Sequence, residues 1–145
     1  MKKIFYLFAI LAVTAAVAMT GCHNRPPFAL LQESVDSVNT YLGQQVPEGG
    51  ISVSLYYDEV TNTVVFKYKL PNEQMAEFTK DNIAFTEDVV LNEVLPNVPA
   101  ELMKNIVDAK AAVMLEYTWP PKGRSEFRIE ADKVAEAYKE FAGGK

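Results

Sequence analysis

The side chains that most often carry out catalysis are scarce in this sequence. His23 is the only histidine and Cys22 the only cysteine, and the two are neighbours near the N-terminus. A Ser-His-Asp or Cys-His site needs an imidazole that a rigid scaffold holds against its nucleophile. One histidine and one cysteine are also too few for a zinc site built from these residues. We therefore predict no catalytic residue, no metal and no cofactor.

Carboxylates are the remaining candidates for acid–base chemistry. Glu87, Asp88 and Glu93 share one predicted helical stretch, and Glu126 and Glu130 lie on the last predicted strand. A hydrolase that uses two carboxylates needs them to face each other across a cleft with different pKa values. A solvated charged surface explains these residues too, and we favour it. A small hydrolase with a carboxylate-based site is the alternative.

Cys22 ends a segment with the features of a sorting signal. Lys2 and Lys3 precede an apolar run over 4–18, which is too short to span roughly 30 Å of hydrocarbon and is typical of a signal-peptide core. Residues 18–22 read AMTGC and resemble the bacterial lipobox, in which an apolar residue, a small residue and Gly or Ala precede the cysteine. The resemblance implies that residues 1–21 are removed and that Cys22 carries a diacylglyceryl group.

The predicted lipid would anchor the chain permanently, because each buried methylene adds about 0.8 kcal/mol and two or three acyl chains are expected. Residues 22–27 form a tether that reaches roughly 20 Å when extended, so the domain should lie close to the membrane. Residue 23 is not the Asp that retains many enterobacterial lipoproteins on the inner membrane. We therefore expect the periplasmic face of the outer membrane, with a Gram-positive cell surface as the alternative.

The mature chain is small and acidic. Without Lys2 and Lys3, twelve basic residues face nineteen acidic ones, a formal net charge of −7. This balance argues against nucleic-acid binding. The length of 28–145 is enough for one domain with a substantial core.

Apolar periodicity predicts an α+β fold. Two β-hairpins should form a four-stranded antiparallel sheet with helices packed on one side. VSLYY at 53–57 resembles VMLEY at 113–117, which predicts a repeated helix–strand–strand–helix unit. The element order resembles small lipoproteins of unknown function from Bacteroidetes and Firmicutes, and this resemblance implies no functional residue. The predicted helices cover 28–42, 73–78, a longer stretch that ends near 95, 99–110 and 132–141, and the predicted strands cover 51–57, 64–70, 113–119 and 124–130.

Two aromatic residues are candidates for an interaction surface. Trp119 begins the turn WPPKG at 119–123, where a rigid bend could present the indole as an anchor. Tyr56 follows Ser52 and Ser54 on the polar side of its strand. The alternative for Trp119, which we favour, is that the indole caps the core. The leading functional hypothesis is a non-enzymatic, membrane-tethered binding or assembly module that acts on an unknown envelope protein or periplasmic ligand.

Overall fold

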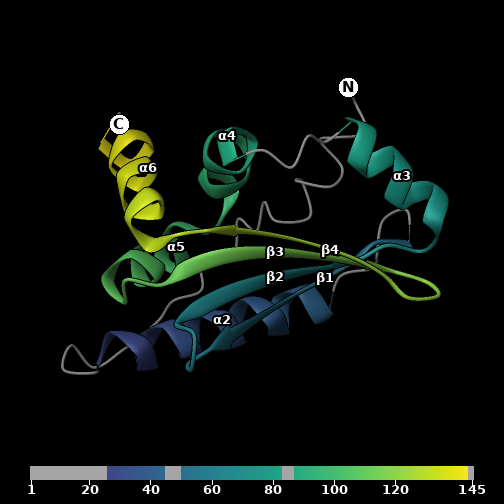
Figure 1. Ribbon diagram of the computed structural model, residues 1–145. Coiled ribbons are helices and arrows are strands. Elements are labelled where there is room, and N and C mark those ends of the chain that lie inside the picture. Colours follow the sequence, from purple (N-terminus) through teal and green to yellow (C-terminus); the bar gives the residue numbers. More distant parts are fainter. Residues whose placement is uncertain (1–25, 45–49, 83–86, 144–145) are drawn as a thin grey trace.

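The computed structural model describes residues 26–44, 50–82 and 87–143 (Figure 1). Residues 1–21, Cys22 and His23 lie outside this part, so the predictions made for them remain predictions. The α+β class and both hairpins are confirmed. In chain order the elements are α2 (Pro27–Gly43), β1 (Ser52–Asp58), β2 (Thr63–Lys69), α3 (Glu73–Asn82), α4 (Glu87–Val89), a π-helical turn (Val90–Val94), a 3₁₀ turn (Leu95–Asn97), α5 (Ala100–Asp108), β3 (Ala112–Trp119), β4 (Gly123–Ile129) and α6 (Ala131–Gly143).

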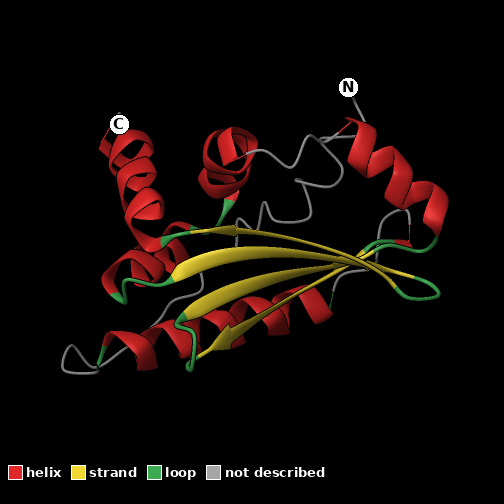
Figure 2. Ribbon diagram, in the orientation of Figure 1, coloured by secondary structure: helices red, strands yellow, loops and turns green. Residues whose placement is uncertain are grey.

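The four strands form one sheet in the order β1-β2-β3-β4 (Figure 2). Each hairpin is antiparallel, but β2 and β3 pair in parallel, with Phe66 opposite Leu115. The sheet is therefore mixed, and the prediction of a wholly antiparallel sheet is wrong at its centre. The physical reason is the connection over 70–111, whose helices return the chain to the other end of the sheet before β3 begins.

The parallel central pair separates the two hairpin turns. The β1–β2 turn and the start of α2 lie at one end of the sheet, on the left of Figure 1, and the β3–β4 turn lies at the opposite end. The predicted order of helix–strand–strand–helix is present twice. However, β1 and β3 run in opposite directions. A rotation that placed the first hairpin on the second would therefore turn Leu55 to the face of the sheet opposite Leu115. Both leucines face the core, so no rotation superposes the two units.

One hydrophobic core lies on a single face of the sheet. Alternate residues of all four strands point into it, as the alternation of apolar residues predicted. The helices contribute their apolar faces to the same core, so they pack on one side as expected. Its members include Leu31, Val35, Val38 and Leu42 of α2; Leu55, Phe66, Leu115 and Ile129 of the strands; and Leu102, Met103, Ile106 and Val134 of the later helices.

Helix α2 also covers the edge of the sheet at β1. The side-chain amide of Asn39 bonds both backbone groups of Leu55: its Nδ2 donates to the carbonyl oxygen, and its Oδ1 accepts from the amide at 2.6 Å. A strand at a sheet edge otherwise leaves such groups open for pairing with another chain. Asn39 therefore takes the place that a fifth strand would occupy at this point.

Candidate functional site

The β3–β4 turn forms a hollow of about 400 Å³ around Trp119. Pro120, Pro121 and Lys122 make the turn, and Lys69 reaches the same hollow from the end of β2. Lys69 lies there because the parallel register places it opposite Thr118. The hollow is thus built from both hairpins, although only the turn itself was predicted from the sequence.

The indole of Trp119 is half-buried and packs against the hydrophobic core. It also lies directly against Gly123, where an added methyl group would overlap the ring. The two interpretations of Trp119 are therefore compatible, because the side chain contacts the core and also lines the hollow. Glycine at 123 is required by this close approach of the indole rather than by its backbone conformation.

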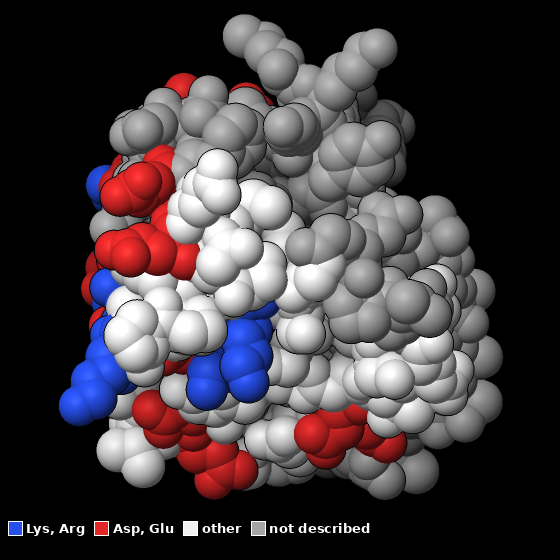
Figure 3. Space-filling model, turned by 90° about the vertical axis from the view of Figure 1, so that its right-hand side faces the viewer, with Lys and Arg blue, Asp and Glu red and all other residues white. Residues whose placement is uncertain are grey.

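Three cations surround the hollow, but they differ in their partners. The Arg124 guanidinium pairs with Glu116 at 3.1 Å and also with Glu126. Among the described residues, neither Lys69 nor Lys122 has a carboxylate partner. Figure 3 looks onto this end of the molecule and shows basic side chains beside uncharged ones, with acidic side chains around them. Lys69 and Lys122 thus offer positive charge to an anionic group that reaches this hollow.

Tyr56 lies elsewhere. It is 41% exposed on the polar face of β1, and the ammonium of Lys67 lies 5.5 Å from the centre of its ring, within range of a cation–π interaction. Trp119 projects from the core side of the sheet at the far end of β3. The structure therefore does not bring the two predicted interaction residues into one surface.

The polar face of the sheet carries both signs of charge. Glu116 is only 5% exposed and lies between Lys67, at 3.8 Å, and Arg124. On the next row Arg128 donates to the Thr63 hydroxyl at 2.7 Å. These cations are engaged by neighbouring strands, so this face does not present a continuous basic surface for a polyanion.

The predicted carboxylate candidates do not converge. Glu87 accepts from Lys133 at 2.6 Å, and Glu130 pairs with Arg128 at 2.9 Å. Asp88 accepts from Asn92 of the π-helical turn that follows α4. In the described ranges no group of three or more His, Cys, Asp or Glu residues is arranged to hold a metal ion.

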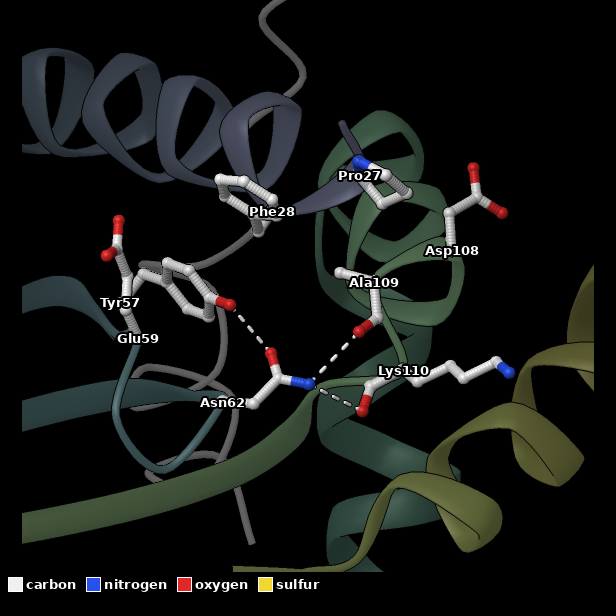
Figure 4. A pocket seen from close by; sticks show the side chains of 8 residues that line it. All are labelled: Pro27, Phe28, Tyr57, Glu59, Asn62, Asp108, Ala109 and Lys110. Atoms are coloured by element: carbon white, nitrogen blue, oxygen red, sulfur yellow. Dashed lines mark hydrogen bonds between the residues drawn. The ribbon is translucent and has the colours of Figure 1, made fainter. Parts of the chain in front are cut away.

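A second hollow, of about 480 Å³, lies at the other end of the sheet, where α2 begins (Figure 4). Phe28 and Tyr57 supply aromatic surface to it. Glu59 and Asp108 carry its carboxylates, which lie on opposite sides of the hollow. No signal in the sequence predicted this hollow, because its residues come from α2, the β1–β2 turn and the end of α5.

Asn62 organises this second hollow. Its Oδ1 accepts from the Tyr57 hydroxyl at 2.7 Å, and its Nδ2 donates to the carbonyl oxygens of Ala109 and Lys110 at 3.0 Å each (Figure 4). Asn62 has a φ of 48°, a left-handed conformation that asparagine tolerates well. Burial raises the pKa of Tyr57, and the charge of Glu59 adds to this effect. Asn62 therefore ties the β1–β2 turn to the end of α5, and the neutral phenol of Tyr57 holds the asparagine amide in place.

Comparison with family models, with curated proteins and with solved structures finds no match to this chain. Within the described residues, no helix is long and apolar enough to span a membrane. The two hollows and the sequence pattern that ends at Cys22 are the features of the chain that bear on its function.

Proposed function

We propose that this chain is a lipoprotein of the cell envelope, anchored through Cys22 to the periplasmic leaflet of an outer membrane. It acts there as a non-enzymatic binding or assembly module. Its partner is an envelope protein that presents acidic side chains to the hollow around Trp119. The observation that carries this proposal is the pair of lysines, Lys69 and Lys122, that line the same hollow as Trp119 and have no carboxylate partner among the described residues.

Charge supports an acidic partner at this hollow. The mature chain has a formal net charge of −7, so most of its surface repels an acidic protein. The β3–β4 tip offers local positive charge beside a large aromatic side chain, a combination that is enriched in binding hot spots. Attraction at the tip and repulsion elsewhere would together select the orientation of the complex.

The position of the tip supports the same proposal. The described chain enters the domain at residue 26 and begins α2 at the end of the sheet opposite Trp119 (Figure 1). A short tether attached at that end would leave the tip directed away from the bilayer. Confinement to a surface also raises the effective concentration of the tip near its partners.

The alternative of a small envelope hydrolase has no such support. Among the carboxylates named for it, Glu87, Asp88 and Glu130 are each engaged by a lysine, an asparagine or an arginine. A hydrolytic pair needs two carboxylates that converge on one substrate bond. No observation on the described residues therefore favours this second function.

Site-specific photo-crosslinking would test the binding proposal. A photoreactive amino acid at position 122 of the lipidated chain should form a discrete adduct in cell envelopes. The same group at position 139, another exposed lysine but on α6, is the matched control. Trp119→Ala should weaken the adduct from position 122. Equal adducts from both positions, or none from position 122, would contradict the proposed site.

The anchor has a separate test. Cys22→Ser should leave an uncleaved precursor and abolish incorporation of a fatty-acid probe. Persistent labelling of the Cys22→Ser chain would show that the lipid is attached elsewhere or that the lipobox resemblance is misleading.

A further inference from the structure

The end of the domain that receives the tether has apolar side chains open to solvent. Phe28 is 52% exposed and Val60 is 95% exposed, and with Tyr56 they are the exposed large hydrophobic residues of the described chain. Phe28 lines the hollow at the start of α2, and the β1–β2 turn contributes Glu59 and Asn62 to the same hollow (Figure 4). Val60 lies in that turn, so both apolar side chains belong to one end of the molecule.

We propose that this end, formed by Phe28, the hollow that it lines and Val60 of the neighbouring turn, rests on the surface of the bilayer. The inference depends on the proposed lipid at Cys22. Five residues separate Cys22 from Phe28, so the covalent tether restricts this end to within roughly 20 Å of the lipid headgroups. Apolar side chains kept so near an interface gain free energy by entering the boundary between headgroups and acyl chains.

The charges around the hollow define the kind of lipid surface that fits. Asp58 is held at the turn by the amide of Val60 at 3.0 Å and by the Thr61 hydroxyl at 2.8 Å, and these hydrogen bonds lower its pKa. Glu59 is exposed beside it. Glu59 and Asp108 line the hollow with one cation, Lys110, and Asp58 adds a third carboxylate, so this end disfavours anionic headgroups and deep insertion. The contact is therefore shallow and prefers zwitterionic phospholipid.

The rigidity of the turn favours such a contact. Asn62 connects the β1–β2 turn to the end of α5 through its two carbonyl contacts, and Tyr57 holds the asparagine amide from the other side. Val60 is thus presented from an ordered support. Ordering it at a membrane would cost less conformational entropy than ordering a loose loop.

Trp119 is the internal reference for a fluorescence test, because it is the only tryptophan in the sequence and lies at the opposite end of the sheet. The eight residues of β3 separate the two ends by about 26 Å. The lipidated chain would be reconstituted in phosphatidylethanolamine–phosphatidylcholine vesicles whose acyl chains carry bromine just below the headgroups. Three proteins would be compared: the native chain, Phe28→Trp with Trp119→Phe, and Val60→Trp with Trp119→Phe. The Val60 substitution itself removes almost no contacts, and Trp119→Phe alone is the control for the loss of the indole from the core.

We expect the tryptophans at positions 28 and 60 to be quenched about twofold or more strongly than Trp119, because interfacial side chains lie within about 5–10 Å of the acyl boundary. Replacing part of the zwitterionic lipid with phosphatidylglycerol should reduce this difference. Equal quenching at all three positions, in protein that carries its lipid and sediments with the vesicles, would overturn the inference and leave the anchor intact. Protein that carries no lipid would instead refute the proposed anchor.

Discussion

Replacing Gly123 by alanine tests how the β3–β4 turn builds its hollow. The added methyl would occupy space now filled by the indole of Trp119. The ring is rigid, so it must either compress its neighbours or swing away from the core. Overpacking of this kind costs about 1–3 kcal/mol. For a domain of this size, 1 kcal/mol corresponds to about 4 °C in the midpoint of thermal unfolding, so Gly123→Ala should lower Tm by about 4–12 °C.

Gly43→Ala is the matched control. A methyl group at Gly43 meets nothing within 4 Å, and the residue ends a helix. Alanine is favoured over glycine in helices by up to about 1 kcal/mol, so this variant should be as stable as the native chain or slightly more stable.

Tryptophan fluorescence separates the two responses of the indole. If the ring leaves the core, its emission should shift to longer wavelength and become more accessible to acrylamide. If the ring stays, the loss should appear in the unfolding midpoint alone. A Gly123→Ala chain with native emission and native Tm would refute the tight approach of Trp119 to this turn.

Two further predictions concern the sheet itself. Asn39→Ala removes both side-chain hydrogen bonds to Leu55 and should lower the free energy of unfolding by about 1–3 kcal/mol. Urea titration measures this difference. An unchanged free energy of unfolding would mean that water fully replaces the asparagine amide. Tyr68 and Tyr117 stack at 4.7 Å within the core, and burial raises the pKa of both hydroxyls. In the unfolded chain these hydroxyls ionise near pH 10, whereas in the folded chain they stay neutral to higher pH. The contribution of both tyrosines to the free energy of unfolding should therefore be fully present below about pH 10 and fall as the pH rises beyond it. Absorbance at 295 nm should then show these two tyrosines ionising only upon unfolding, and reversible early ionisation would contradict their burial.

The sequence predicted the elements of the fold better than their arrangement. Alternation of apolar residues located both hairpins and identified the face that each strand buries, as Leu55 and Leu115 illustrate. Alternation has no direction, so it could not distinguish a parallel from an antiparallel pairing of β2 with β3. The long helical connection over 70–111 was the available signal, because parallel neighbours require a crossover of this kind.

The candidate sites were predictable only in part. Trp119 and its turn were identified from composition and rigidity. Lys69 was not associated with them, because it approaches Trp119 only through the parallel register. In an antiparallel arrangement the same lysine would lie beside the start of β3. The hollow at Asn62 depends on contacts between distant segments, which local sequence patterns do not encode.

The two edges of the sheet differ in a way that limits self-association. At the β1 edge, Asn39 occupies backbone groups that another strand would need. At the β4 edge, Arg124, Glu126 and Arg128 alternate along an otherwise unpaired strand. Because pairing at the β1 edge would have to displace Asn39 from Leu55, strand-to-strand contact is favoured at the β4 edge, and contact through that edge alone closes into a pair rather than a fibre. A protein crowded on a membrane surface would in this way be protected from polymerising through its own sheet.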